Sequence, residues 1–430
     1  MEAQVGVVIL VSSLFLLLIL RVPVAFSLGL SASFAALYMK IPLLIIAQKM
    51  VSGVNSFSLM AIPFFILAGE IMGQGGISRR LIDFSNIIVG RVRGGLSMVN
   101  IQASMFFGGI SGSSVADTSS IGSIMIPMME KKGYDKDYSV NVTITSSTQG
   151  VIIPPSHNMI IYSVAAGGIS VGRLFLGGVI PGILLGITLM VLSYAIAVKR
   201  GYPRGEKVDL RTAIRTIRES ILGLMTAIII IVGVVTGVFT ATESAAIAAV
   251  YAFVVTFFVY REVGLKQIHS ILINSLKTLS IVMAVIATSS AFGYMMALLR
   301  VPQLITDGLL AVSTNKIIVL LMINVILLIL GMIMDMAPLI LITTPILLPV
   351  ALKVGMDPIQ FGVVMMLNLG IGLITPPVGS TLFVGCSIAG ISIEKVARSL
   401  VPFYIMLFGY LLIVTFIPQL TLLLPNLMMK

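Results

Sequence analysis

Two clusters of small, hydroxylated and proline residues interrupt otherwise apolar runs of the sequence. In the first, Ser111 and Ser113 flank a glycine and Pro154-Pro155 follows; in the second, Asp335 precedes Pro376-Pro377. Each break in a helix leaves backbone carbonyl and N–H groups without intrahelical partners. Carbonyl, hydroxyl and carboxylate oxygens bind hard cations, and free N–H groups at a helix start bind anions. This chemistry suits ions and a charged solute.

The two clusters predict two Na⁺ sites built from oxygen ligands. The ligands of the first site are Ser111, Ser113, Gly150, Ile153 and Pro155. The ligands of the second site are Asp335, Gly372, Thr375 and Pro377. The alternative is that the glycines and prolines only shape kinks, while the hydroxyls bond back to helix carbonyls.

Further polar side chains beside the breaks form the predicted substrate site, because polar residues at membrane depth are functional candidates. They are Ser114, Asp117, Ser156, His157, Asn158, Ser380 and Thr381. Hydroxyl, imidazole and amide groups of this kind can hydrogen-bond a polyhydroxylated ligand. Alternatively, His157 is a neutral structural histidine, and Asp117 caps the helix that follows it. Packing or capping explains Glu70 and Glu243 as readily as a role in transport does.

The amino-acid composition indicates the class of protein in which these residues lie. The chain is 58% hydrophobic and 10% charged, with a mean hydropathy of +1.13, which indicates a polytopic membrane protein. Its length accommodates about eleven spans of roughly 20 residues. One cysteine and two histidines exclude a disulfide and a Cys/His metal site, and no P-loop is present. We expect neither an enzyme nor an organic cofactor. We also expect no nucleic-acid partner, since the net charge of +11 in a membrane protein is first a signal of topology.

The basic segments predict how the chain is threaded through the bilayer. The run Lys199–Arg218 is expected to lie in the cytoplasm as an amphipathic surface helix, and 75–94 as a basic cytoplasmic loop. Counting spans outward from this anchor places both termini outside. The first apolar run, Val5–Leu20, is read as a retained span and not as a signal peptide.

Two segments do not fit ordinary spans. The apolar stretches Gly95–Phe107 and Asp117–Met129 are too short to cross a bilayer and are separated by a Gly/Ser-rich stretch at 108–114. They predict a re-entrant hairpin over 95–130. Pro154-Pro155 then predicts a broken helix over 139–168. Irregular backbone at this depth is tolerated only where it is buried in protein or lines a cavity.

The same features recur 222 positions later. Matched pairs include Asp135/Asp357, Gly150/Gly372, Pro154/Pro376, Pro155/Pro377 and Gly168/Gly390. The offset predicts a second hairpin over 317–352, with its tip at 331–338, and a second broken helix over 359–390. The basic charge of 75–94 has little counterpart in the second copy, so the repeats are inverted. Inverted repeats with discontinuous helices are typical of secondary transporters.

This organisation divides the chain into four expected parts. The ranges are 1–55 (scaffold helices), 56–198 (first repeat), 199–270 (amphipathic segment and scaffold helices) and 271–430 (second repeat). Together they describe an all-α polytopic membrane protein with two re-entrant hairpins in inverted repeats.

Six motifs resemble the large membrane subunit of the tripartite ATP-independent periplasmic (TRAP) transporters. They are AIPFFILAGE at 61–70, SGSSVADT at 111–118, IPPS at 153–156, FTATE at 239–243, GMIMD at 331–335 and LITPP at 373–377. They occur in order over essentially the whole chain. The chain departs from many members at Ala241, where those members carry proline.

The resemblance implies Na⁺-coupled import of an organic acid by an elevator motion, in which both hairpins and both broken helices slide against a scaffold. It also implies a small four-helix membrane subunit and a periplasmic substrate-binding protein as partners, in the bacterial inner membrane. His157-Asn158 resembles the sialic-acid branch. The alternatives are a C4-dicarboxylate importer, or a cation-coupled organic-anion antiporter or exporter of related build.

Overall fold

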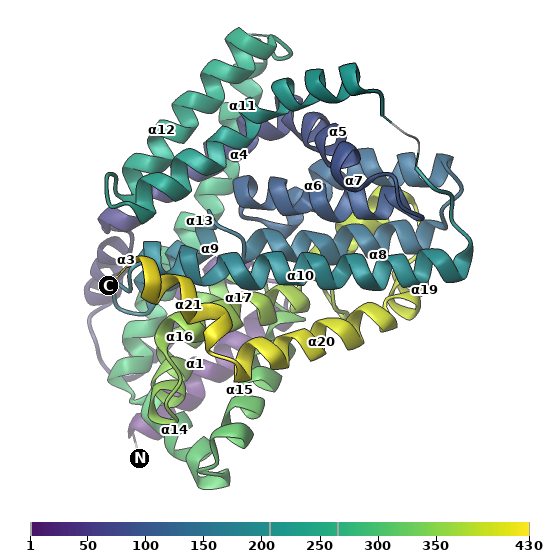
Figure 1. Ribbon diagram of the computed structural model, residues 1–430. Coiled ribbons are helices and arrows are strands. Elements are labelled where there is room, and N and C mark those ends of the chain that lie inside the picture. Colours follow the sequence, from purple (N-terminus) through teal and green to yellow (C-terminus); the bar gives the residue numbers. More distant parts are fainter. Residues whose placement is uncertain (1, 206–207, 265, 430) are drawn as a thin grey trace.

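The structure is a computed structural model that describes residues 2–205, 208–264 and 266–429. Within these ranges the chain is helical, apart from one isolated bridge between Arg93 and Arg204 (Figure 1). Glu206 and Lys207, part of the predicted basic run, lie outside the described residues. The all-α expectation is therefore confirmed for the described chain.

The helices follow one another with short connections. In the first half they are α1 (Glu2–Ile19), α2 (Val24–Tyr38), α3 (Leu43–Val54), η1 (Phe57–Met60), α4 (Ala61–Gln74), α5 (Ile77–Val89), α6 (Gly95–Ser111), α7 (Ser114–Lys131), α8 (Lys136–Ser147), η2 (Thr148–Val151), α9 (His157–Ala165) and α10 (Val171–Arg200). In the second half they are α11 (Leu210–Val235), α12 (Ala241–Val254), the π-helical turn η3 (Val255–Tyr260), α13 (Gln267–Leu298), α14 (Val301–Val312), α15 (Lys316–Gly331), α16 (Met336–Lys353), α17 (Pro358–Gly372), α18 (Ser380–Ala389), α19 (Ile393–Ser399), α20 (Val401–Phe416) and α21 (Gln419–Met428).

The number of spans is smaller than expected when length and hydropathy are applied to the described helices. Seven of them are long and apolar enough to cross a membrane, or up to nine if each of two bent pairs counts as one span. A polytopic membrane protein is supported, whereas eleven spans are not confirmed. Apolar side chains such as Leu16, Ile19 and Ile405 are largely exposed on the outer helices. Lipid is the natural neighbour of such a surface.

The first hairpin consists of α6 and α7, and its break is shorter than predicted. Gly108 and Gly109 continue α6, so only Gly112 and Ser113 separate the two arms. Gly112 adopts a left-handed conformation with φ of 62°, which glycine tolerates best. Ser113 then caps α7 by accepting a hydrogen bond from the Ala116 N–H at 3.3 Å. The prediction that residues 108–114 are irregular was therefore wrong over most of its length.

The second hairpin consists of α15 and α16, joined by Met332–Asp335 inside the predicted tip. The backbone N–H of Val378 donates to the carbonyl of Met332 at 3.1 Å. This bond ties the hairpin tip to the second broken helix.

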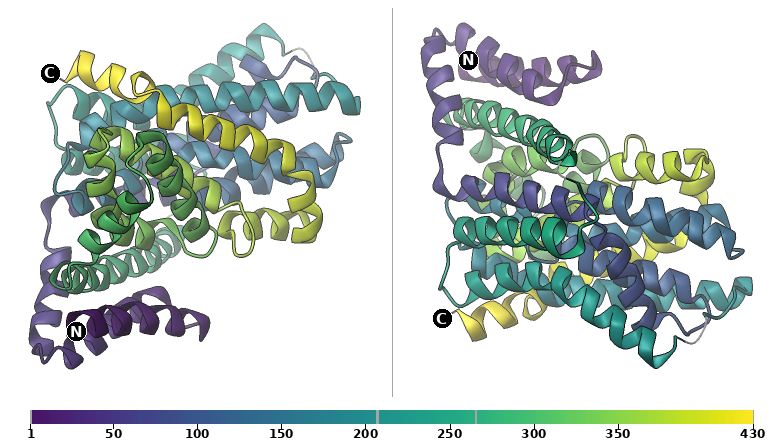
Figure 2. Two further views of the ribbon diagram at one scale, coloured as in Figure 1. Left: turned by 90° about the horizontal axis from the view of Figure 1, so that it is seen from below. Right: turned by 90° about the horizontal axis from the view of Figure 1, so that it is seen from above.

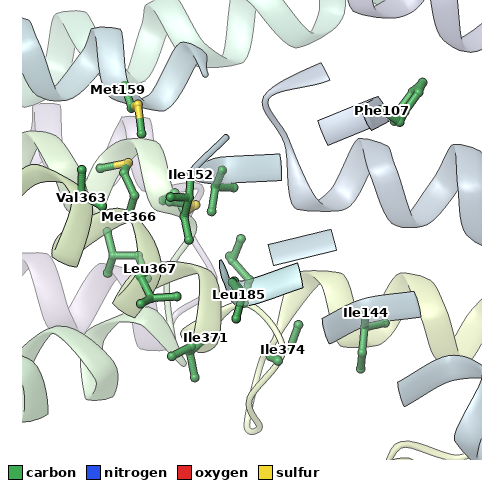
Figure 3. Close-up of a cluster of buried hydrophobic side chains, with 14 of the residues drawn as sticks. Phe107, Ile144, Ile152, Met159, Leu185, Val363, Met366, Leu367, Ile371 and Ile374 are labelled. Atoms are coloured by element: carbon green, nitrogen blue, oxygen red, sulfur yellow. The ribbon is translucent and has the colours of Figure 1, made fainter. Parts of the chain in front are cut away.

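Both broken helices are present. The first comprises α8, the 3₁₀ turn η2 and α9, and the second comprises α17 and α18. The bonds Pro154-Pro155 and Pro376-Pro377 within the breaks are both cis. Every residue of α17 from Ile359 onward is buried. Figure 3 shows its side chains Val363, Met366 and Leu367 near Ile152 and Met159, so the first break lies in the apolar core.

Two connections differ from the predicted topology. Most of the predicted loop 75–94 is the helix α5 (Ile77–Val89), because Leu81, Ile82 and other apolar side chains are buried along one face. Arg80 of α5 pairs with Glu262 at 2.6 Å and lies 3.8 Å from the ring centroid of Tyr260. The basic run is not a separate surface helix either, since α10 ends at Arg200 and α11 continues unbroken into an apolar span.

The two ends of the described chain lie on the same side of the molecule, at the left of Figures 1 and 2. The C-terminal end of α10 lies at the opposite side (Figure 1). Which side is the cytoplasm stays a prediction from charge.

Candidate functional site

A cavity of about 780 Å³ lies where the tips of both hairpins meet α9, α4 and α13. From the tips and α9, its lining includes the predicted residues Ser111, Ser113, Ser114, His157, Asn158 and Asp335. The structure therefore brings residues from both repeats and both predicted Na⁺ sites to one space. A cavity of this size can hold a small organic molecule.

Three helices begin at this cavity. Ser114 starts α7, His157 starts α9 and Met336 starts α16, and all three line the space. The first N–H groups of a helix lack intrahelical partners, and its N-terminal end carries partial positive charge. Three converging helix starts favour an anionic group in the cavity.

The first hairpin tip packs directly on the first break. A Cβ on Gly112 would lie 3.1 Å from the backbone nitrogen of His157, and one on Gly109 would lie 3.0 Å from the Pro154 carbonyl oxygen. Asn158 Nδ2 donates to the Gly112 carbonyl at 3.4 Å and to Met336 Sδ at 3.9 Å. Asn158 thus links the two hairpin tips through one amide.

The predicted ligands of the first Na⁺ site are gathered around this contact. The hydroxyl of Ser111 interacts with the backbone of Ser113 at 3.4 Å. Gly150 lies against the hairpin, since a Cβ on Gly108 would come within 2.4 Å of its Cα. Ile153 and Pro155 belong to the break itself. The Ser113 hydroxyl already accepts the capping hydrogen bond of α7, so it has less capacity left for an ion.

In the second predicted site, Asp335 lines the cavity, whereas Thr375 is already engaged in a hydrogen bond within the protein. Asp335 precedes α16 without a side-chain capping bond, and its side chain lines the cavity. Gly372 packs against Gly331 of the hairpin, as Gly150 packs against Gly108. The Thr375 hydroxyl donates to the Ile371 carbonyl at 2.7 Å, which is the kink-shaping role given above as the alternative. Pro377 is exposed beside this break.

Four predicted substrate residues do not line the cavity. The Ser156 hydroxyl is fully buried and donates to the Val151 carbonyl at 3.0 Å. Thr381 is fully buried and donates to the Ser114 hydroxyl at 3.1 Å. The Ser380 hydroxyl is buried without a hydrogen-bond partner, and Asp117 is fully buried within α7. His157 lines the cavity at the start of α9, and its Nδ1 atom is buried without a hydrogen-bond partner among the described residues.

Two capping alternatives have opposite outcomes. Asp117 does not cap α7, because Ser113 occupies that position and Asp117 lies within the helix. Glu243 does cap its helix, since Thr240 and Glu243 form a reciprocal capping box at the start of α12.

The sequence did not reveal the scaffold side of the cavity. This side is contributed by α4, the start of α5 and α13, through residues that include Phe65, Glu70, Gln74, Arg79, Thr278 and Val282. Glu70 Oε1 accepts hydrogen bonds from Gln74 and from Asn274 of α13. The available signal was the pair Gly69 and Gly73, one turn apart on α4, because both glycines line the cavity.

Groups of three or more His, Cys, Asp or Glu residues that could hold a metal are absent from the described ranges. Any cation at this cavity would therefore bind mainly to hydroxyl and carbonyl oxygens, with at most the two carboxylates of Asp335 and Glu70. Such a donor set suits a monovalent hard cation better than Zn²⁺ or another transition metal.

The chain is similar to known proteins over nearly its full length. The family described as "Tripartite ATP-independent periplasmic transporter, DctM component" matches residues 11–420. The chain is 40% identical to the C4-dicarboxylate TRAP transporter large permease protein DctM of Pseudomonas aeruginosa, covering 89% of each chain. It is 39% identical to the sialic acid TRAP transporter large permease protein SiaM of Vibrio cholerae, covering 93% of this chain and 95% of the other. Among solved structures, the YdaH transporter of Alcanivorax borkumensis shares the fold, with a TM-score of 0.62 at 12% identity over 85% of this chain and 86% of the other.

Proposed function

The chain belongs to the DctM family of tripartite ATP-independent periplasmic transporters as a large membrane permease, and from this premise we propose that it couples Na⁺ entry to import of an organic acid. Members of this family are transport permeases and not enzymes. The proposed partners are a small four-helix membrane subunit and a periplasmic substrate-binding protein that delivers the acid. The proposed location is the bacterial inner membrane, with both termini on the periplasmic side.

The observation that carries the proposal is the convergence of three helix starts with Asp335 at one cavity. The helix starts favour the carboxylate of a substrate, whereas Asp335 and nearby hydroxyl and carbonyl oxygens favour a cation. Binding both in one space gives a physical basis for coupling, since each reduces the electrostatic cost of the other.

We assign the Na⁺ ions to the two breaks. The first site uses Ser111 and Ser113 with backbone oxygens of the first break. The second uses Asp335 with backbone oxygens of the second break. The matching glycine contacts, Gly108 with Gly150 and Gly331 with Gly372, support a common design because each brings a hairpin arm against a break.

The proposed motion is an elevator. The hairpins and broken helices form the moving part, while α4 and α13 belong to the scaffold that lines the other wall of the cavity. The lining reaches Gln74 and Arg79 at the α4–α5 junction. Because charge predicts that this junction lies in the cytoplasm, the proposed state is inward-facing, and the proposed role of Arg79 is to attract the anion toward the exit.

The favoured substrate is sialic acid or a related sugar acid. The lining of the cavity by His157 and Asn158 supports this preference, because imidazole and amide groups can hydrogen-bond a polyhydroxylated ligand. A C4-dicarboxylate is the second candidate, since the DctM and SiaM relatives are equally similar to this chain.

The test is uptake by the complete system in liposomes. The permease would be reconstituted with its small subunit, and labelled sialic acid or succinate would be supplied with the cognate binding protein. We expect sialic acid to accumulate only when the binding protein is present. Preferential uptake of succinate would replace the favoured substrate with the second candidate, and uptake that needs no binding protein would contradict the tripartite assembly.

A further inference from the structure

Asp117 is a buried carboxylate that neither the cavity nor the helix cap explains. It lies in the first turn of α7 with 0% of its surface exposed. Neither carboxylate oxygen has a hydrogen-bond partner among the described residues. A buried charge without a partner is strongly destabilising, so this carboxyl group either holds a proton or is balanced by a cation.

Two serines lie next to this carboxylate and join hydroxyl pairs with neighbouring helices: Ser104 interacts with Asp117, and Ser114 precedes it by about one helical turn on α7. Ser114 of α7 lies 2.6 Å from the hydroxyl of Ser147 on α8 and 3.1 Å from that of Thr381 on α18. Ser104 of α6 lies 3.1 Å from Ser146 on α8, and it is the side chain that interacts with the Asp117 carboxylate, without the geometry of a hydrogen bond. All of these hydroxyls are buried.

Asp117 and the two serines next to it have no polar counterparts in the second repeat. At the offset of 222 positions, Asp117 corresponds to Leu339, Ser104 to Ile326 and Ser114 to Met336. Leu339 and Met336 are buried there, with 1% and 3% of their surfaces exposed. The fold therefore packs apolar side chains at the equivalent place, and it does not require a carboxylate.

We propose that Asp117 and the hydroxyls of Ser104 and Ser114 bind a Na⁺ ion in an enclosed third site, separate from the two sites at the breaks. One carboxylate balances one monovalent cation, and neutral hydroxyl oxygens complete the coordination. Ser114 also lines the cavity, so the ion enters from the cavity past Ser114. The inference rests on the proposed function only in the choice of Na⁺ as the ion.

The test is a Na⁺ titration of the thermal stability of the purified full complex, with choline replacing Na⁺ at constant ionic strength. It compares wild type with Asp117→Asn, Asp117→Leu and Ser114→Ala. The Leu variant reproduces the residue of the second repeat. Asp307→Asn, an exposed position on α14, is the matched control for the loss of one negative charge.

We expect both Asp117 variants to lose part of the Na⁺-induced rise in Tm and to show a less steep dependence on Na⁺. Asp307→Asn should follow the wild type. A titration unchanged in Asp117→Asn and Asp117→Leu would overturn the site, and it would indicate a neutral carboxyl that holds a proton.

Ser114→Ala keeps the carboxylate, so it decides the question if the Asp117 variants fail to fold. It should raise the Na⁺ concentration for half-maximal stabilisation about fivefold, as expected for a lost ligand. An unchanged midpoint overturns the site. If uptake requires Na⁺ but the titrations of the variants are unchanged, only the third site is contradicted. If uptake does not depend on Na⁺, the proposed function itself is contradicted.

Discussion

Gly108 of the first hairpin and Gly150 of the first broken helix approach so closely that a Cβ on Gly108 would lie 2.4 Å from the Gly150 Cα. Backbone atoms cannot move aside as a flexible side chain can, so any larger residue must separate the hairpin from the break. The second repeat has the same arrangement, because a Cβ on Gly372 would lie 2.5 Å from the Gly331 carbonyl carbon. These contacts hold the predicted ion ligands in place.

Gly108→Ala should therefore destabilise the protein by about 1–3 kcal/mol, the usual cost of overpacking a close contact. The measurement is the thermal unfolding of the purified permease. Gly293→Ala in α13 is the control, since a Cβ at that position meets nothing within 4 Å. That control should be neutral or stabilising by up to about 1 kcal/mol, because alanine favours helix over glycine. Equal Tm values for both variants would contradict the close packing.

His157→Ala should raise the KM for the transported acid about tenfold, the effect of losing roughly 1.4 kcal/mol of binding. The reason is that His157 lines the cavity in which the acid is proposed to bind. Ser156→Ala is the neighbouring control, because its hydroxyl bonds only to the Val151 carbonyl. That variant should lower Tm and leave KM unchanged. If Ser156→Ala raised KM while His157→Ala did not, the assignment of His157 would be wrong.

Asp335→Ala should raise the Na⁺ concentration for half-maximal uptake about tenfold, since hydrogen bonds and ion contacts of a charged ligand are worth roughly 1.5–3 kcal/mol. The carboxylate lines the cavity and does not cap α16, so its loss removes an ion ligand and spares the helix. The assay is initial uptake rate against external Na⁺ at saturating substrate. An unchanged Na⁺ dependence would remove Asp335 from the second site.

Asp135 gives a pH-dependent prediction outside the spans. The hydrogen bond from the Tyr202 hydroxyl, at 2.7 Å, and the Arg200 guanidinium, at 2.8 Å, hold the pKa of the Asp135 carboxyl below its ordinary value of 3.8. A depressed folded-state pKa stabilises the protein above the unfolded pKa, and this contribution is lost as the pH falls through the folded value.

Asp135→Asn should accordingly lower Tm by about 1–3 °C at pH 7, a small effect because the carboxylate is half exposed. The difference in Tm between the variant and the wild type should become smaller once the pH falls below about 4. Differential scanning calorimetry at several pH values measures this. A gap independent of pH would show that the carboxylate charge is not the source.

The hairpins and broken helices could be predicted from the sequence because proline lacks a backbone N–H and glycine adopts conformations that end a helix. It misjudged Gly108 and Gly109, which permit a close approach within α6 and do not break it. The helix α5 was missed because its charged face resembled a loop. The scaffold wall of the cavity depends on how α4 and α13 pack against the tips, a long-range contact that no local spacing reveals.

The central claim is that Na⁺ entry drives uptake of an organic acid through this permease. The most direct measurement is uptake of labelled sialic acid into proteoliposomes that contain the permease and its small subunit, with binding protein outside and an imposed Na⁺ gradient. We predict accumulation when the gradient is directed inward, and its loss when K⁺ replaces Na⁺ at the same ionic strength. Equal uptake with and without Na⁺ would contradict the account.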